Sequence, residues 1–283
     1  MGVETLPEVP SLGPLFARGV LSARGRHGDA LPDRTLRVED VRIERERLTA
    51  YQRLCGYAVS DVVPQPYPWV LAFPIQTALM ARPDFPVALP GMVHLANRVA
   101  THRPIHASDR LSLTVSTPSL TPHRKGRVLD ARIEATVDGE LVWECDSRYL
   151  SPGRGSEDAP AGNQPPAPPT GQAVAQWSLP DGLGREYAGV SGDINPIHLH
   201  PLTARTMGFR RHIAHGMWSY ARTLAALGRD SLGPSTSEVW FTKPIFLPSR
   251  VALVVEREAG LTTAALRSVR TPETSHLVLT LQT

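Results

Sequence analysis

The strongest constraint on the fold is a pattern that occurs twice in the same order. THRPIHASDRLSLTV begins at Thr101, and the similar FTKPIFLPSRVALVV surrounds Lys243. Both combine Pro-Ile, a downstream Arg and an alternating apolar pattern. Upstream of them, LPGMVHLANRVA (Leu89–Ala100) and AHGMWSYARTLA (Ala214–Ala225) share a Gly-Met pair followed by a helix-like apolar spacing. Two matches in the same order predict an internal duplication, with one helix in each copy.

Alternating apolar and polar residues predict that the rest of each copy forms β-strands. A period of two, punctuated by Gly, Pro or Asp-Gly, is typical of antiparallel strands. A helix with an apolar stripe must bury it, and the concave face of a curved sheet offers a place. We therefore expect an α+β fold in which each copy wraps a curved antiparallel sheet around a central helix. The expected strands are residues 34–44, 109–120, 126–139, 141–150, 173–179, 237–245, 249–258, 261–270 and 276–283.

A segment rich in proline, glycine and small polar residues separates the two copies. Ser151–Gln172 reads SPGRGSEDAPAGNQPPAPPTGQ and contains too little apolar surface to form a core. The parts before and after it are each long enough for one domain. We therefore expect an N-terminal repeat over residues 1–150, a linker over 151–172 and a C-terminal repeat over 173–283.

Composition narrows the class of protein. The formal net charge is only +3 and the arginines are scattered, which disfavours nucleic-acid binding but suits an anionic small ligand or an acidic carrier protein. No apolar run approaches the roughly 20 residues of a membrane-spanning helix, and the first residues lack a secretory signal pattern. The two cysteines, Cys55 and Cys145, have no disulfide or metal-binding spacing. These features predict a cytoplasmic protein without membrane association.

The segment YAGVSGDINPIH, Tyr187–His198, concentrates groups that can move protons. Its glycines and proline predict a loop rather than a regular helix, and Pro196 stiffens that loop. Asn195 has an amide that can bond to nearby backbone groups. An aspartate and a histidine held close together, here Asp193 and His198, form a candidate general acid–base pair near neutral pH.

A second element, IAHGMWSYARTLAAL, places Gly216 at the expected start of a helix. The free N–H groups and the dipole of a helix N terminus favour negative charge. A glycine also allows a ligand to approach the backbone closely. This is the arrangement needed to stabilise an enolate oxygen formed on a thioester carbonyl.

These two elements together resemble the MaoC-like dehydratases, a family that includes the (R)-specific enoyl-CoA hydratases. The pattern Tyr-x-x-x-Ser-Gly-Asp-x-Asn-Pro-Ile-His matches Tyr187–His198 without gaps, and HGM follows at the expected distance. The resemblance implies a hot-dog fold, doubled here because two repeats are fused in one chain. The specific motif lies only in the second repeat.

The resemblance also implies an activity. Asp193 and His198 would be the catalytic pair, and the backbone N–H of Gly216 would form part of the oxyanion hole. The expected reaction is reversible syn hydration of a trans-2-enoyl thioester to a (3R)-3-hydroxyacyl thioester, carried by CoA or acyl carrier protein, with no metal or other cofactor. The residues expected to shape the site are Tyr187, Ser191, Asn195, Pro196, His215 and Met217.

The first repeat is expected to have lost the activity. SDVVPQP can be aligned with GDINPIH, which places Asp61 opposite Asp193 but Pro66 opposite His198. The imidazole is then missing, so this repeat would complete the sheet and shape the acyl pocket.

Two further expectations concern the segment that follows. Pro90 stands where the second repeat has His215. The apolar stretch PQPYPWVLAFPIQTALMARPDFPVALP, residues 64–90, is expected to be irregular and to line a pocket for a bulky acyl chain, with a rearranged loop that does not touch substrate as the alternative.

Other interpretations of single residues remain open. The histidine spacings also suit zinc, although no cysteine is near and the family resemblance explains two of these residues without a metal. The histidines concerned are His198, His200, His212 and His215, of which His200 and His212 are expected in surface positions or loops. The large residues of the expected helix, Met217, Trp218 and Tyr220, are expected to pack the core or the acyl tunnel.

Two other functions compete with the first. The enzyme would act on an unusual branched or dicarboxylic acyl-CoA, or the protein would bind acyl thioesters without catalysis. Because a fused pair already supplies two repeats, a monomer and a homodimer are both compatible with the sequence.

Overall fold

The computed structural model describes residues 2–15, 28, 30–89, 91–159, 162 and 164–283. The chain forms two compact units that interleave along the sequence. Unit 1 comprises residues 1–43, 68–99 and 108–163, and unit 2 comprises residues 44–67, 100–107 and 164–283. Two short stretches of the first half therefore pack with the second half. No helix in the described part of the chain has the length and apolar character needed to cross a membrane.

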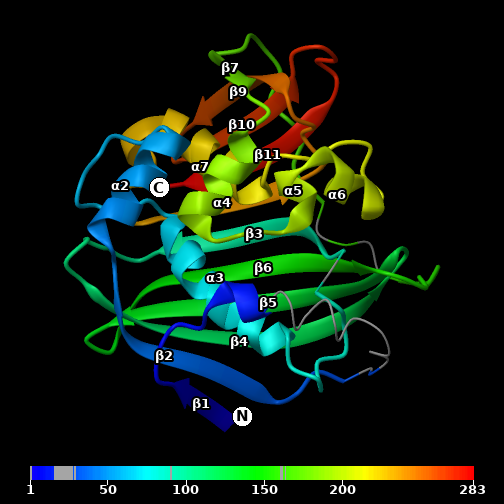
Figure 1. Ribbon diagram of the computed structural model, residues 1–283. Helices are drawn as coiled ribbons and strands as arrows, with labels where there is room; N and C mark the ends of the chain where they lie inside the picture. Colours follow the sequence, from blue (N-terminus) through cyan, green and yellow to red (C-terminus); the bar gives the residue numbers. More distant parts are fainter. Residues whose placement is uncertain (1, 16–27, 29, 90, 160–161, 163) are drawn as a thin grey trace. The chain divides into compact units, whose positions relative to one another are not determined.

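Unit 1 is a sheet with one long helix against it (Figure 1). Neighbouring strands are antiparallel wherever their pairing is resolved, except for β1, which runs parallel to β2. In spatial order the strands are β1 (Gly2–Leu6), β2 (Arg34–Arg42), β4 (Arg110–His123), β5 (Gly126–Val137), β6 (Glu140–Pro152) and β3 (Val93–Thr101). From Leu129 to Val137 the residues of β5 alternate between buried and half-buried. That alternation is the period-two pattern from which the strands were predicted.

The helix of unit 1 is α3 (Tyr67–Met80), and this corrects two expectations. Residues 64–90 were expected to be irregular, and the helix was expected over residues 89–100. Nearly every side chain of α3 is buried, and Pro74 lies inside the helix, so the sequence shows neither an apolar stripe nor a helix-compatible composition.

The stretch expected to be the first helix is instead strand β3. Its apolar residues Leu95 and Val99 are four positions apart. That spacing puts two residues on one face of a helix and also on one face of a strand, because four is a multiple of two. The spacing alone therefore could not distinguish the two structures.

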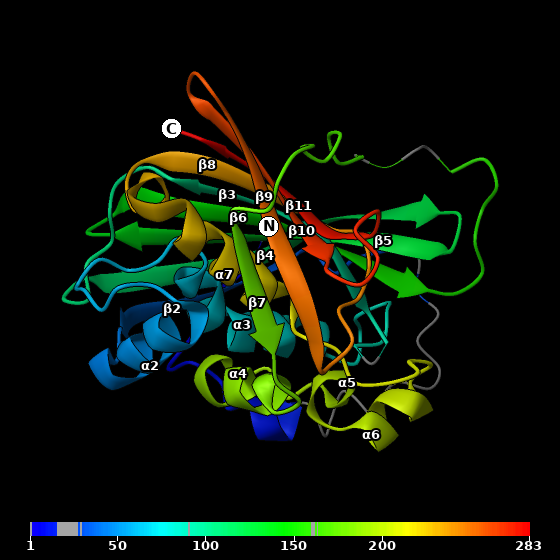
Figure 2. The ribbon, with the colours of Figure 1, turned by 90° about the horizontal axis from the view of Figure 1, so that it is seen from above.

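Unit 2 has the same construction. Its strands are all antiparallel to their neighbours, in the order β8 (Ser235–Phe241), β11 (Ser275–Gln282), β10 (Leu261–Ser268), β9 (Ser249–Glu258) and β7 (Ala175–Leu179). The predicted helix is α7 (Gly216–Leu227), which contacts β10 and β11. The other helices are α2 (Arg45–Cys55), α4 (Leu183–Ser191), α5 (Pro196–Leu199), α6 (Pro201–Thr206) and the short 3₁₀ turn η1 (Gly228–Ser231). Helices α2 and α4 pack against each other (Figure 2).

The backbone bonds show which residues of the two repeats are equivalent. Val62 bridges His106, and Ile213 bridges Phe246, with the same antiparallel geometry. The neighbouring backbone hydrogen bonds show the same correspondence between the repeats. Val63 N–H donates to the Ile105 carbonyl, just as Ala214 N–H donates to the Ile245 carbonyl. The duplication is therefore confirmed around the two Pro-Ile segments, and Val62 is the counterpart of Ile213.

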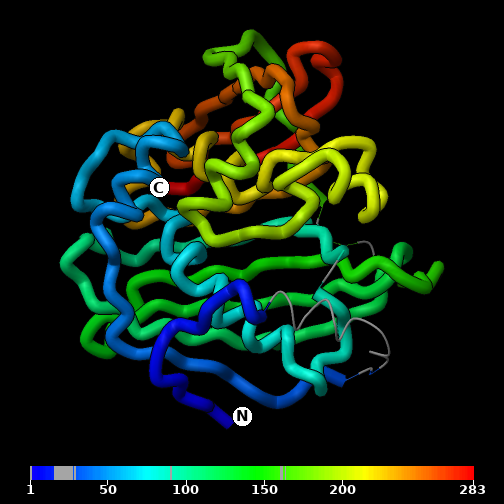
Figure 3. The backbone as a smooth tube through the Cα atoms, in the orientation of Figure 1, coloured from blue at the N-terminus to red at the C-terminus, as the bar shows by residue number. Residues whose placement is uncertain are grey.

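A second pair of equivalent positions lies at the ends of α2 and α4. Gly56 follows α2 with a φ of 81°, and Gly192 follows α4 with a φ of 80°. Both are left-handed caps, a conformation that favours glycine. YQRLCGY, ending at Tyr57, is thus the counterpart of YAGVSGD, ending at Asp193. Figure 3 shows the course of the chain through both segments.

Candidate active site

The motif Tyr187–His198 spans the end of one helix and the start of another, which corrects the expectation of a continuous loop. Tyr187 to Ser191 form the last turns of α4, and Pro196 is the first residue of α5. Only residues 192–195 connect the helices. Asn195 caps α5 by accepting a hydrogen bond from Ile197 N–H at 3.4 Å, and proline is well suited to the first position of a helix.

A glycine in α4 allows the two helices to come close. A Cβ atom on Gly184 would lie 1.9 Å from the carbonyl oxygen of His198. Backbone cannot yield to such an overlap, so any side chain at this position would push α5 and its histidine away from α4.

We expect Gly184→Ala to destabilise the protein by about 1–3 kcal/mol and to lower activity by displacing His198. Gly189→Ala in the same helix is the matched control, because a Cβ there meets no described atom within 4 Å. Alanine favours a helix over glycine, so the control should be neutral or slightly stabilising. Thermal unfolding and activity of both variants measure this, and equal behaviour of the two would contradict it.

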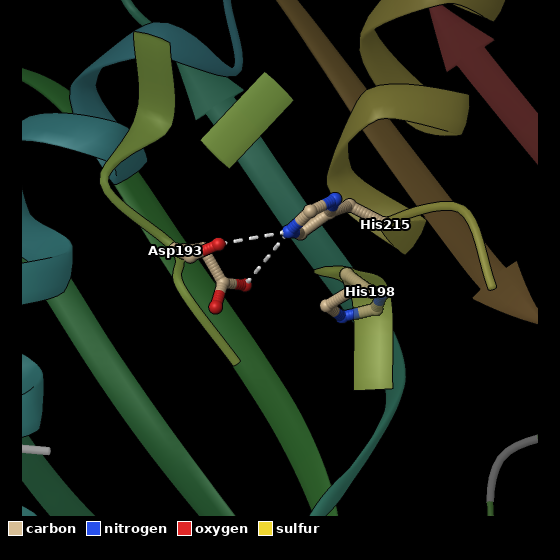
Figure 4. Close-up of side chains that lie close together, drawn as sticks. All are labelled: Asp193, His198 and His215. Atoms are coloured by element: carbon tan, nitrogen blue, oxygen red, sulfur yellow. Dashed lines mark hydrogen bonds and ion pairs between the residues drawn. The ribbon is translucent and has the colours of Figure 1, made fainter. Parts of the chain in front are cut away.

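Asp193 is held through its backbone on both sides. Its N–H donates to Ser191 Oγ at 3.1 Å, and its carbonyl accepts a hydrogen bond from His215 Nε2 at 3.0 Å (Figure 4). Its carboxylate accepts a bond from Asn195 N–H at 3.1 Å. The carboxylate therefore has a fixed position, with Oδ2 3.9 Å from His215 Nε2.

His198 is fixed in one tautomer. Its Nδ1 lies 2.8 Å from the carbonyl oxygen of Ile213. A carbonyl only accepts, so Nδ1 carries the proton, and Nε2 of the neutral ring is left with a lone pair. The ring also stacks on His215, with centroids 3.7 Å apart and planes 25° apart. This leaves Nε2 as the atom of His198 that can exchange a proton.

Burial brings the acidities of the pair toward each other. It raises the pKa of Asp193, opposed by the charge of His198 and the Asn195 N–H. It lowers the pKa of His198, opposed by the charge of Asp193 and the bond to Ile213. The pKa of His215 is lowered well below its usual value, first by burial and then by His198, so His215 is neutral and donates from Nε2.

The spacing of the three side chains suits a small bridging molecule. One carboxylate oxygen of Asp193 and one imidazole nitrogen each of His198 and His215 all lie within 4.8 Å of one another. A water with two normal hydrogen bonds can join atoms up to roughly 5 Å apart. The same three residues are candidate metal ligands, but His215 Nε2, which faces Asp193, carries a proton and so has no lone pair to offer.

Gly216 begins α7, as the sequence predicts, and His215 is its N-cap residue. No side chain of the described residues caps this helix terminus with a hydrogen bond. The glycine also has a packing role that the sequence did not reveal. A Cβ there would lie 3.0–3.2 Å from the ring of Phe241 in β8, tighter than an ordinary contact.

The remaining predicted residues take their places around this centre. Tyr187 is buried and its ring lies 4.8 Å from that of His215, while Ser191 Oγ donates to the Tyr187 carbonyl at 2.8 Å. The residues expected to pack the helix, Met217, Trp218 and Tyr220, are all buried.

Both remaining histidines agree with the expectation of a surface position or a loop. His200 is exposed. His212 lies in the irregular stretch between α6 and α7, where it is wholly buried and its Nε2 lies 3.0 Å from the Asp181 carbonyl. Neither belongs to the cluster of Asp193, His198 and His215.

The counterpart of this site in the first repeat differs from the predicted one. Tyr57, not Asp61, occupies the position of Asp193, because Gly56 corresponds to Gly192. Asp61 is exposed and forms an ion pair with Arg45. The alignment of SDVVPQP with GDINPIH is therefore wrong.

The loss of the imidazole also has a different origin from the predicted replacement by Pro66. From the left-handed glycine to the bridging residue the chain advances 21 residues in the second repeat (192 to 213) but 6 in the first (56 to 62). The missing 15 residues correspond to the α5–α6 segment. Pro64 takes the place of His215, and Pro90 lies outside the described residues.

One hydrogen-bond partner in the site could not be predicted from the sequence. The carbonyl of Ile213 sets the tautomer of His198, but a backbone group leaves no signal in the amino-acid sequence. Only the return of the chain before α7 brings it to the imidazole.

Comparison with known proteins shows which family the chain resembles. The family model described as MaoC like domain matches residues 173–276. The chain is 33% identical over 245 residues to 3-hydroxyacyl-thioester dehydratase X of Mycobacterium tuberculosis (strain ATCC 25618 / H37Rv), covering 85% of this chain and 86% of that protein. It is 34% identical over 74 residues to an (R)-specific enoyl-CoA hydratase of Aeromonas caviae, covering 25% and 55%.

Solved structures give the same result for the fold. A crystal structure of HtdX from M. tuberculosis matches with a TM-score of 0.78 and 31% identity, covering 88% of this chain and 99% of that one. A MaoC-like dehydratase from Phytophthora capsici matches in fold with a TM-score of 0.72 at 19% identity, covering 88% and 94%. The α+β double hot-dog prediction is thereby confirmed, and the chain belongs to the MaoC-like dehydratase family.

Proposed function

We propose that the protein is a hydro-lyase that interconverts trans-2-enoyl thioesters and (3R)-3-hydroxyacyl thioesters in fatty-acid or related acyl metabolism. The observation that carries this proposal is the juxtaposition of the Asp193 carboxylate and the His198 imidazole in one cluster, in which the two histidines are buried and Asp193 is half-buried. The names of the M. tuberculosis and A. caviae relatives support the same reaction class.

The mechanism follows from which groups can take up a proton and which can stabilise negative charge. Water bound between Asp193 and His198 gives a proton to one of them, and its oxygen bonds to C3 of the enoyl thioester. The C2–C3 π electrons move toward the carbonyl, and the enolate oxygen accepts a hydrogen bond from Gly216 N–H. C2 then takes up a proton held by the pair, on the face to which the oxygen was added. Dehydration is the reverse sequence.

His215 supports the pair instead of exchanging protons with the substrate. It donates to the backbone carbonyl of Asp193 and stacks on His198, so it fixes both positions at once. Because its Nε2 carries a proton, we propose proton transfer without a metal ion at this centre. Tyr187, Ser191, Asn195, Pro196 and Met217 keep their proposed roles in shaping the site.

The two repeats have different roles in the proposed reaction. The C-terminal repeat, residues 173–283, supplies the reacting groups. In the described part of the N-terminal repeat, residues 1–150, Tyr57 stands at the position of Asp193, and the segment that would carry the counterpart of His198 is missing. The substrate is an acyl-CoA or an acyl-carrier-protein thioester, and a homodimer is compatible with the fused pair. Both cysteines are buried free thiols, and we propose a reduced, cytoplasmic setting.

Hydration of crotonyl-CoA and of longer enoyl-CoAs, followed by loss of the enoyl-thioester absorbance, tests the proposal directly. Turnover with formation of the (3R) product is the expected result. A profile confined to branched or dicarboxylic acyl-CoAs would favour the narrower substrate class. Binding of enoyl-CoA without turnover would favour the non-catalytic acyl-thioester binder and contradict the proposal.

The pH dependence of kcat/KM should reflect the coupled titration of Asp193 and His198. A proton taken up by either Asp193 or His198 removes an acceptor for the water proton, so kcat/KM should fall as the pH is lowered. Burial raises the pKa of Asp193 and lowers that of His198, so the acid limb should show one apparent pKa that belongs to the pair, displaced upward from an ordinary aspartate and downward from an ordinary histidine.

The variant Asp193→Asn provides the check on that assignment. The carboxylate raises the pKa of His198, so its removal should shift the remaining acid limb to lower pH. Residual activity measured between pH 4 and 9 tests this shift. An increase of wild-type activity on acidification, or a shift of the limb to higher pH in the variant, would contradict the assignment.

A further inference from the structure

A residue of the first repeat reaches the segment that carries Asp193. Arg47 lies in α2, which packs against α4 although about 140 residues separate them in the chain. Its Nε donates to the Val190 carbonyl at 2.7 Å, and its Nη2 donates to the Ser191 carbonyl at 2.9 Å. These carbonyls are among the last of α4, which lack partners inside a helix. Arg47 therefore caps the C terminus of α4.

Ser191 connects Arg47 to Asp193 through hydrogen bonds on both sides. The carbonyl of Ser191 accepts from Arg47, and its hydroxyl oxygen accepts from Asp193 N–H at 3.1 Å. The same hydroxyl donates back to the Tyr187 carbonyl at 2.8 Å. Ser191 is thus fixed from two sides, and its position sets that of the Asp193 backbone.

Among the described residues, no carboxylate forms an ion pair with Arg47, whereas Arg45 on the same helix pairs with Asp61. Arg47 is half-buried. A cation at a helix C terminus is favourable, and the fork of two donors fits two consecutive carbonyls.

We infer that Arg47 is a positioning residue for the reaction proposed above, on which this inference rests. Arg47 holds the end of α4, Ser191 passes that constraint to Asp193, and His215 holds the other side of the Asp193 peptide. The first repeat therefore contributes directly to the geometry of the reacting carboxylate. Residues 173–283 alone lack this contact.

The kinetic test compares Arg47→Ala with Arg53→Ala. Both arginines lie on α2, but Arg53 is exposed and, among the described residues, its side chain forms no hydrogen bond or ion pair with α4. We expect Arg47→Ala to lower kcat about 10- to 100-fold, because small displacements of a reacting group are costly, with KM within about twofold. Arg47→Lys keeps the charge but cannot form the fork, so its kcat should lie between those of wild type and Arg47→Ala.

A second measurement does not depend on turnover. Amide hydrogen exchange at residues 190–195 should be faster in Arg47→Ala than in wild type, and unchanged in Arg53→Ala. If Arg47→Ala does not fold, Arg47→Lys replaces it in both measurements. Wild-type exchange at these amides, together with kcat equal to that of Arg53→Ala, would overturn the inference. Absence of hydratase activity in the wild type would instead remove the proposed function, while the exchange data would still judge the Arg47 contact.

Discussion

Asp193→Asn is expected to lower kcat for hydration of crotonyl-CoA by about 10²- to 10⁴-fold, the usual contribution of a positioned acid–base group. Asparagine has the same shape as aspartate, and its amide oxygen can still accept the bond from Asn195 N–H. It cannot take up a proton from water near neutral pH. The variant should therefore keep its fold and lose the chemical step. Loss of enoyl-thioester absorbance and the thermal unfolding midpoint measure the two effects separately.

Asp61→Asn is the matched control for this variant. Asp61 is the residue that sequence comparison alone placed opposite Asp193, yet it lies exposed and paired with Arg45. An exposed ion pair contributes at most about 1 kcal/mol to stability, so this variant should turn over at the wild-type rate. Equal rates for Asp193→Asn and Asp61→Asn would exclude Asp193 from the mechanism.

The second large effect is expected at His198, where two substitutions separate its two nitrogens. In His198→Asn the side-chain amide takes the place of Nδ1 and can still donate to the Ile213 carbonyl, but nothing replaces Nε2. In His198→Gln an amide reaches toward the position of Nε2 but cannot accept a proton. Both variants should lose about 10²- to 10⁴-fold in kcat.

The two variants should differ in stability. His198→Asn keeps the donor to the buried carbonyl, whereas His198→Gln is expected to leave that carbonyl less well satisfied, at a cost of about 1–3 kcal/mol. His200→Asn, on an exposed neighbour of the same segment, serves as the control and should behave as wild type. Near wild-type kcat in folded His198→Asn would show that Nε2 takes no part in catalysis.

Much of the fold could be predicted because its strands are amphipathic in a simple way. In β5, for example, every second residue from Leu129 to Val137 is buried, so the period of two is visible in the sequence. The helices were harder. In α7 an apolar stripe and the glycine at its start marked the element, whereas α3 is buried on nearly all sides and contains Pro74, and so has no period to detect.

The correspondence between the two repeats could not be aligned correctly from the sequence alone. The alignment of Asp61 with Asp193 rested on an acid and a proline at matching spacing. The structure instead aligns Gly56 with Gly192, because both end a helix in the left-handed conformation. Fifteen residues are missing between that glycine and the strand bridge in the first repeat, and a comparison without gaps could not accommodate them.

The amino-acid sequence by itself determined most of the strands, the start of α7 and the family resemblance, and it indicated the proposed pair Asp193 and His198, because each depends on residues close together in the chain. Only the tertiary structure decided the tautomer of His198, the support of Asp193 by His215 and the cap that Arg47 places on α4. Those contacts join residues 15 to 144 positions apart. Hydrogen bonds at such separations depend on how the elements pack, and backbone carbonyls, which accept all of these bonds, are the same at every position of a sequence.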